Sequence, residues 1–119
     1  MSGSKQLVVG FWNNHGIQNK IESPVVQNWI TKHDIIFLCE TKTSTNFSVP
    51  DFRVVSGKTT NPNRGGVVFL IKNYLSERVT KVDISMDNQI WFELSDIPNV
   101  LFGGCYVAPS DSAYFSDQS

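Results

Sequence analysis

The sequence predicts an α/β fold: one mixed, mostly antiparallel sheet with few covering helices. The N-terminal third alternates strand, helix and strand, an order typical of a parallel strand pair joined by a right-handed crossover. The C-terminal half contains consecutive strand candidates with connections as short as three residues, which is typical of antiparallel neighbours. The chain has 119 residues, 40% of them hydrophobic and 12% aromatic, as expected for one folded domain.

Three elements are expected in the N-terminal part. The apolar run KQLVVGFW (residues 5–12) predicts a strand that ends at the turn formers 13–16. A short helix follows, with Ser23 as N-cap, Pro24 as first helical residue and apolar side chains at i,i+4 spacing. The run DIIFLCE (34–40) is apolar on both faces and therefore predicts a central strand.

Five further strands are expected after residue 51, separated by a polar loop and by short turns. The loop, KTTNPNRGG (58–66), contains proline and two glycines among polar residues. The strand candidates are FRVVSG (52–57), VVFLIKNYL (67–75), RVTKVDIS (78–85), QIWFELS (89–95) and NVLFGGCYV (99–107). The residues after them are expected to begin a helix capped by Ser110 or Asp111.

Both faces of the expected sheet are apolar, and only one convincing helix is present to cover them. An uncovered apolar face of this size normally packs on a partner surface. We therefore expect a homodimer, or a missing C-terminal half, to cover the open face. The longest apolar runs are far shorter than the roughly 20 residues of a membrane-spanning helix, so no membrane partner is expected. No signal peptide opens the chain, and the expected location is intracellular, nuclear or cytoplasmic.

Charge and cysteine content give further expectations. The net charge of -1 excludes a strongly basic, sequence-blind nucleic-acid coat protein. All ten lysines and arginines lie within residues 1–81, which indicates either a side that faces a polyanion or chance in a short chain. Cys39 and Cys105 lie in strand-like runs and are expected to be reduced and buried. Strand alternation places Cys39 toward the helix-covered face and Glu40 on the opposite one.

Three polar side chains lie at or near the ends of strand candidates. Asn13 follows the first strand, Glu40 follows the second, and Tyr106 lies near the end of the last. In sheets with parallel strands, ligands collect beyond the carboxyl ends, so these side chains converge if the strands are neighbours. An amide, a carboxylate and a phenol suit a hydrated Mg²⁺ ion with a phosphate beside it. The alternative is a solvated glutamate, a packing tyrosine and a turn asparagine.

The chain resembles the first half of an endonuclease/exonuclease/phosphatase domain. It is most similar to the endonuclease domain of LINE-type (non-LTR) retrotransposon polyproteins, which is related to apurinic/apyrimidinic endonucleases. The resemblance depends on five segments in the family's order: FWNNHGIQNK, DIIFLCETK, NRGGVVFLIK, QIWFEL and GGCYVAPSDSAYF. Three family motifs are matched as follows: the Trp-Asn-x-x-Gly turn by Trp12, Asn13 and Gly16, the Glu-Thr strand end by Glu40 and Thr41, and the Tyr-x-x-Pro segment by Tyr106 and Pro109.

This resemblance implies that residues 1–119 are about half of a two-sheet α/β sandwich that hydrolyses DNA phosphodiester bonds with Mg²⁺ or Mn²⁺. By resemblance, Glu40 is the metal ligand, Asn13 lies in the first catalytic loop and Tyr106 contacts the scissile phosphate. Arg64 is expected either to reach a DNA backbone or to have a structural role in its loop. His15 and His33 are expected to be structural or surface residues.

The family's second half supplies an Asp-x-Asn segment and a Ser-Asp-His-like segment, and this chain has neither. Metal-assisted hydrolysis needs a positioned nucleophile as well as a Lewis acid, so we expect little or no nuclease activity from this chain alone. One alternative is a non-catalytic half-domain that acts as a binding or dimerisation module. Another is a phosphatase or lipid phosphodiesterase of the same superfamily.

Overall fold

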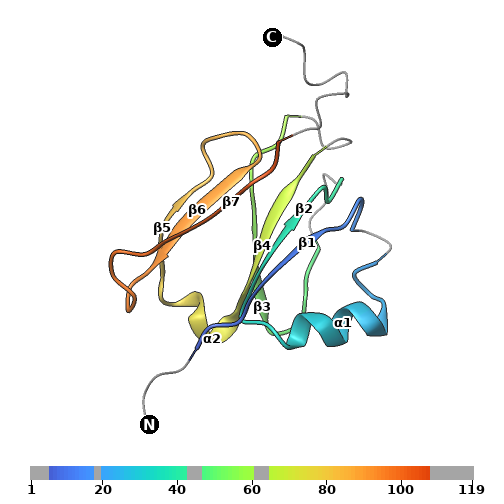
Figure 1. The fold of residues 1–119 in the computed structure, drawn as a ribbon, viewed down its shortest axis with the longest axis horizontal. Helices are drawn as coiled ribbons and strands as arrows, with labels where there is room; N and C mark the ends of the chain where they lie inside the picture. The colour runs from blue at the N-terminus through green and yellow to red at the C-terminus, as the bar shows by residue number, and fades with distance from the viewer. Residues whose placement is uncertain (1–5, 18–19, 43–46, 61–64, 108–119) are drawn as a thin grey trace.

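Seven strands and two helices follow one another in the computed structural model, which describes residues 6–17, 20–42, 47–60 and 65–107. Figure 1 shows their arrangement. The elements are β1 (Val9–Asn13), α1 (Pro24–Thr31), β2 (Ile35–Cys39), β3 (Phe52–Ser56), β4 (Val67–Lys72), α2 (Asn73–Ser76), β5 (Val79–Asp83), β6 (Gln89–Leu94) and β7 (Leu101–Cys105). The expected C-terminal helix lies outside the described residues.

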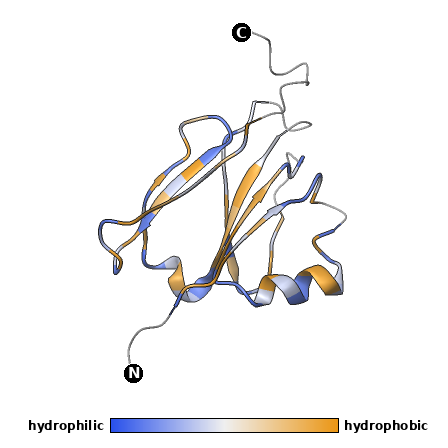
Figure 2. Ribbon diagram, viewed as in Figure 1, coloured by the Kyte–Doolittle hydropathy of each residue, from blue (hydrophilic) through white to orange (hydrophobic). Residues whose placement is uncertain are grey.

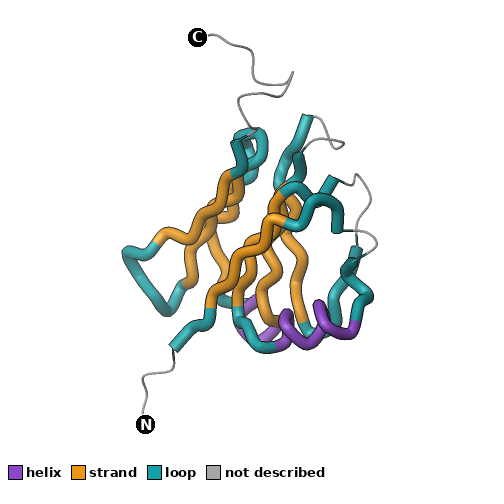
Figure 3. Tube along the Cα trace, turned by 45° about the vertical axis from the view of Figure 1, so that its right-hand side comes forward, coloured by secondary structure: helices purple, strands orange, loops and turns teal. Residues whose placement is uncertain are grey.

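The strands form two sheets. The first has the order β1-β2-β4-β3, with β1 parallel to β2 and the other pairs antiparallel; the second has the order β5-β6-β7 and is antiparallel. The predicted class is confirmed: a mixed, mostly antiparallel α/β fold with few helices. The expectation of a single sheet is wrong, because the chain leaves β4 at Lys72 and turns through α2, which buries Leu75. The turn leads into a second layer, visible beside the first sheet in Figure 3.

The main core lies between the two sheets. It contains Phe37 of β2, Phe69 of β4 and Phe92 of β6, all less than a tenth exposed. The ring centroids of Phe37 and Phe69 are 5.0 Å apart, and those of Phe69 and Phe92 are also 5.0 Å apart, so aromatic packing runs from one sheet to the other. Fully burying each such side chain stabilises the fold by roughly 1.5–3 kcal/mol. Figure 2 shows the apolar colouring of β2 and β4 and the alternating polar and apolar bands of β6.

Helix α1 covers the other face of the first sheet. Ile30 of α1 and Ile17 of the preceding loop pack against Ile36 and Leu38 of β2. Every residue of β2 is buried, because its side chains alternate between this cluster and the core between the sheets. Cys39 belongs to the core between the sheets. The expectation that Cys39 points toward the helix-covered face is therefore wrong, since the second sheet covers the opposite face.

Each sheet has two edge strands among the described residues: β1 and β3 in the first sheet, and β5 and β7 in the second. A Cβ atom at Gly104 of β7 would collide with the ring of Phe37, which places β7 opposite β2. No described strand lies opposite β1, and Val9 and Phe11 are 56% and 62% exposed there. Neither helix among the described residues has the length and apolar character needed to cross a membrane.

Candidate functional site

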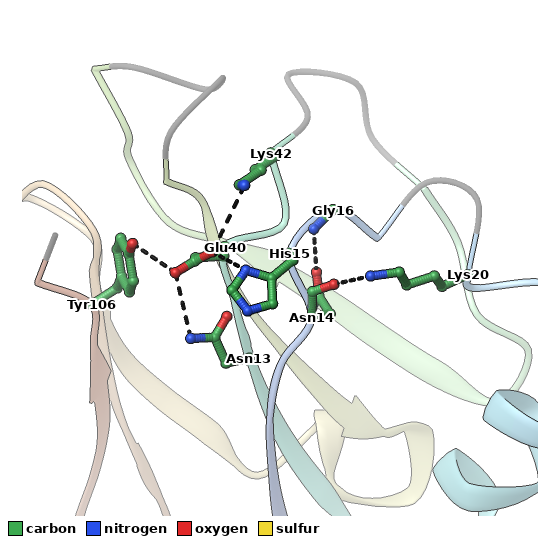
Figure 4. A network of polar contacts seen from close by, with 8 residues as sticks. All are labelled: Asn13, Asn14, His15, Gly16, Lys20, Glu40, Lys42 and Tyr106. Atoms are coloured by element: carbon green, nitrogen blue, oxygen red, sulfur yellow. Dashed lines mark hydrogen bonds and ion pairs between the residues drawn. The ribbon is translucent and has the colours of Figure 1, made fainter. Parts of the chain in front are cut away.

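Asn13, Glu40 and Tyr106 meet at the carboxyl ends of β1, β2 and β7. Parallel pairing of β1 with β2 aligns Asn13 with Cys39, so that Glu40 is the first residue beyond the strand. The Tyr106 hydroxyl donates a hydrogen bond to Glu40 Oε2 at 2.8 Å, and Asn13 Nδ2 donates to the same oxygen at 3.4 Å. Figure 4 shows the three side chains pointing toward one another. The amide, carboxylate and phenol that the sequence predicts at three strand ends are thus neighbours.

The backbone around Glu40 is held in an unusual conformation. Glu40 has φ 58°, and His15 and Lys42 also have positive φ values of 51° and 53°. A bulky L-residue in this left-handed region is strained by roughly 1–2 kcal/mol. Gly16 N donates to Glu40 O at 2.7 Å, and Thr41 N donates to Gly66 O at 3.3 Å, so the surrounding loops maintain the geometry. The turn at the end of β2 directs the Glu40 side chain toward Asn13 and Tyr106.

The turn after β1 is fixed by a buried asparagine. Asn14 is 1% exposed, and its Oδ1 accepts a hydrogen bond from Gly16 N at 3.1 Å. Asn14 N donates to Cys39 O at 3.1 Å, and Lys20 Nζ donates to Asn14 O. Local bonds of this kind stabilise tight turns. They hold the segment that carries Asn13 and His15 against the end of β2.

Two basic side chains contact the other oxygen of Glu40, and neither contact is predicted by the sequence pattern. His15 Nδ1 lies 2.6 Å and Lys42 Nζ 3.9 Å from Glu40 Oε1. The His15 side chain is 66% exposed and that of Lys42 38%, against 9% for Glu40. One carboxylate oxygen therefore accepts hydrogen bonds from Tyr106 and Asn13. The other contacts the longer, partly exposed side chains of His15 and Lys42. The contacts depend on the left-handed backbone at His15 and Lys42, which residue type alone does not predict.

The electrostatics of the site keep Glu40 ionised at neutral pH. Burial favours the neutral acid and raises the pKa of Glu40. The hydrogen bond from Tyr106, the electrostatic attraction of a protonated His15 and the hydrogen bonds from Asn13 and His15 act in the opposite direction and outweigh burial. The pKa of Glu40 is consequently below its ordinary value, so the side chain is a carboxylate, the form in which it can bind a cation.

The two cysteines differ in their surroundings. Both are free; Cys39 is buried and Cys105 is exposed, so the expectation that both thiols are buried is wrong for Cys105. Burial raises the pKa of Cys39 to about 11, and the Glu40 charge contributes in the same direction. Cys105 lies on the edge strand β7 at a position that faces away from the core. Neither thiol contacts the oxygens of Glu40.

The glycine pair of the RGG loop packs against this site. A Cβ atom at Gly66 would collide with Thr41 Oγ1, and one at Gly65 would lie 3.0 Å from Asn88 Oδ1. Gly66 has φ 108°, a conformation that favours glycine. The pair therefore lets the end of β4 approach the residues after Glu40. Arg64, which the sequence suggested as a contact to DNA, lies outside the described residues.

Glu40 could bind a hard divalent cation as its single protein ligand. Among residues 6–17, 20–42, 47–60 and 65–107, no group of three His, Cys, Asp or Glu side chains is arranged to bind a metal. Mg²⁺ is nevertheless commonly held by one or two carboxylates, with waters and a substrate phosphate completing its coordination. The buried, ionised Glu40 fits that pattern as a single protein ligand, and its Oε1 is the oxygen that the partly exposed side chains of His15 and Lys42 contact.

No protein-family model matches the sequence, and no curated protein matches it.

Proposed function

We propose that this chain is the N-terminal portion of a divalent-metal-dependent phosphodiesterase that acts on DNA, of the LINE-retrotransposon endonuclease type. The observation that carries the proposal is the ionised Glu40 carboxylate, held at the strand ends with Tyr106 and Asn13 on one oxygen. A phosphodiesterase needs such a carboxylate to bind a cation and hydrogen-bond donors to bind the phosphate. The resemblance of the sequence segments to that family supplies the reaction class.

Each residue of the site has a distinct role in this proposal. Glu40 would bind the cation, which supplies positive charge beside a phosphoryl oxygen during hydrolysis. The Tyr106 hydroxyl is a donor that suits a phosphate oxygen, and the Asn13 amide suits a phosphate oxygen or a water. In this proposal the partly exposed side chains of Lys42 and His15, which contact Glu40 Oε1, would also contact the polyanion. A single carboxylate does not also provide the base that activates water, so we expect little or no cleavage by residues 1–119 alone.

The proposal is tested by measuring Mn²⁺ binding by isothermal titration calorimetry, with plasmid nicking in Mg²⁺ as a second assay. Glu40→Gln removes the charge at nearly the same size and is expected to weaken Mn²⁺ binding by at least roughly tenfold. The control, Glu77→Gln, removes an exposed carboxylate on the turn after α2 and should change nothing. Equal binding by wild type and Glu40→Gln contradicts the metal site. Nicking by the wild-type monomer that disappears in Glu40→Gln contradicts only the expected inactivity.

A second candidate function, a binding or dimerisation module, is favoured by one observation. Edge strand β1 leaves Val9 and Phe11 more than half exposed, with no described strand opposite them. Unpaired edge strands readily pair with another chain, and exposed apolar patches mark interaction surfaces. In this alternative the site residues are structural, and Glu40 links the two sheets through Tyr106.

A further inference from the structure

Asn88, in the turn between β5 and β6, joins three parts of the chain that surround the candidate site. It is 4% exposed and has φ 56°, a left-handed conformation that asparagine adopts more readily than most residues. Its backbone N donates to Lys58 O at 2.7 Å, and its backbone O accepts from Tyr106 N at 3.0 Å. Its side-chain Oδ1 accepts from Gly66 N at 3.2 Å in a buried hydrogen bond.

These bonds place Asn88 between the two partners of the Tyr106–Glu40 hydrogen bond. On one side Asn88 holds the backbone of Tyr106, which belongs to the second sheet. On the other side it holds Gly66, whose carbonyl accepts from Thr41 N at 3.3 Å, directly after Glu40. The distance between the Tyr106 hydroxyl and the Glu40 carboxylate thus depends on how the sheets are joined at Asn88.

The close packing of Asn88 leaves its amide little freedom. A Cβ atom at Gly65 would lie 3.0 Å from Asn88 Oδ1 and 3.1 Å from Nδ2, so the amide lies directly against the glycine backbone. A second contact joins the segment that contains Lys58 to the turn that contains Asn88. In it, Thr60 Oγ1 donates to Asp87 Oδ2 at 3.2 Å, in an exposed position. The two contacts are neighbours in the chain: the one at Asn88 reaches the segments that carry Glu40 and Tyr106, and the one at Asp87 joins Thr60.

We propose that Asn88 is a positioning residue, whose side-chain bond to Gly66 sets the Tyr106 hydroxyl on the Glu40 carboxylate. Its effect on metal binding rests on the proposed function. The positioning of the Tyr106 hydroxyl does not rest on the proposed function, because the Tyr106–Glu40 hydrogen bond is present without metal. Loss of the Asn88 side chain should therefore displace Tyr106 from Glu40 even if the protein binds no cation.

The test uses ¹³C-tyrosine-labelled, metal-free protein, in which the Tyr106 signal is assigned by its loss in Tyr106→Phe. Asn88→Gly keeps the left-handed backbone and removes the acceptor, whereas Asn88→Asp keeps an acceptor oxygen at the same length. Asn88→Gly should shift the Tyr106 signal in the direction seen for Glu40→Ala, and Asn88→Asp should leave it near its wild-type position. Thr60→Ala removes the exposed hydroxyl bond to Asp87 and keeps the bond from Thr60 N to Asp87 Oδ1, and it should not move the signal.

A wild-type Tyr106 signal in folded Asn88→Gly overturns the inference, and so does a shift of equal size in Thr60→Ala. If Asn88→Gly does not fold, hydrogen exchange of the wild-type protein decides: a Gly66 amide that exchanges as fast as an exposed amide overturns the inference, and a protected one supports it. Where wild type binds Mn²⁺, Asn88→Gly should weaken binding roughly tenfold, with recovery in Asn88→Asp. If Glu40→Gln leaves Mn²⁺ binding unchanged, the proposed function fails, while the Tyr106 shift still tests Asn88.

Discussion

Glu40 combines burial, ionisation and a strained backbone in one residue. Its side chain is 9% exposed, its pKa lies below the ordinary value, and its φ is 58°. A buried charge is tolerated only where hydrogen bonds and opposite charges compensate its loss of hydration, and Tyr106, Asn13 and His15 provide them here. Strained residues persist where the surrounding structure holds them, and they cluster at functional sites. The three features together are the reason for proposing Glu40 as the centre of the candidate site.

Asp83, at the end of β5, allows a pH-dependent prediction at a position remote from β2. Its carboxylate accepts hydrogen bonds from the Ser85 hydroxyl at 2.7 Å and from Ser85 N at 2.9 Å, and these lower the pKa of Asp83. Because the folded pKa is lowered, the contribution of Asp83 to stability is present above the ordinary aspartate pKa and is lost as the pH falls through the folded value. Ser85→Ala should raise the pKa partway, since the backbone donor remains.

The measurement is a ¹³C NMR titration of the Asp83 carboxyl carbon in wild type and Ser85→Ala. Ser95→Ala, at an exposed serine in another turn, is the control and should leave the titration unchanged. An Asp83 midpoint that is the same in Ser85→Ala and wild type would show that the hydroxyl does not contribute.

At this scale the sequence predicts part of the candidate site. Asn13 and Glu40 follow from the parallel strands that precede them, because neighbouring parallel strands end at the same edge. Tyr106 reaches Glu40 from a different sheet, which strand order along the chain does not reveal. His15 and Asn88 depend on left-handed backbone geometry, and no spacing in the sequence indicates which polar residue will adopt it. Local pattern thus predicts the ends of strands, while contacts between loops depend on the assembled fold.

At the scale of elements, β7 contains two adjacent glycines, Gly103 and Gly104, which face opposite sides of the second sheet. A Cβ atom at Gly104 would collide with the Phe37 ring, and one at Gly103 with the Trp91 ring. Phe37 is fixed between the rings of Phe11 and Phe69, at centroid distances of 6.1 and 5.0 Å. It therefore has little room to move, whereas the half-buried Trp91 lies on the other face of the second sheet and can shift toward solvent.

Gly104→Ala should consequently lower the free energy of unfolding by about 1–3 kcal/mol through overpacking. Gly103→Ala should lower it by less, because displacement of Trp91 leaves the core intact. Urea denaturation of both variants measures the difference. A loss for Gly103→Ala as large as that for Gly104→Ala would mean that β7 does not pack against β2 through Gly104.

The elements were largely predictable, but their division into layers was not. Apolar runs and turn residues predict all seven strands and α1, since these signals are local. The sequence predicts one strand over residues 67–75, yet β4 ends at Lys72 and α2 buries Leu75 between the layers. The burial of Leu75 is compatible both with a continuous strand and with a strand followed by a short helix. Whether the hairpins that follow extend the first sheet or pack on it is a non-local choice, and the core between Phe69 and Phe92 decides it.

At the scale of the whole molecule, the offset between the sheets leaves an open end of the core. Strand β7 lies opposite β2 and β6 opposite β4, as the contacts of Phe37 and Phe69 indicate. No described strand covers β1. Phe11 therefore stacks on Phe37 with one face and remains 62% exposed. The exposed ring continues the main core of the protein, unlike an isolated apolar residue on a helix surface.

This continuity predicts self-association through the β1 edge. Sedimentation equilibrium of the wild-type chain should show a mass that rises with concentration. Phe11→Lys should weaken association about tenfold or more, because burial of a phenylalanine contributes roughly 1.5–3 kcal/mol and 1.4 kcal/mol is a factor of ten. Val25→Lys is the matched control: Val25 is 78% exposed on α1, away from the open core.

A wild-type chain that remains monomeric removes the support for the dimerisation module. Equal weakening by Phe11→Lys and Val25→Lys would mean that association does not depend specifically on the β1 edge. Association that only Phe11→Lys weakens shows that the open core is an interface, and the metal-binding test of Glu40 then decides whether it serves a catalytic domain.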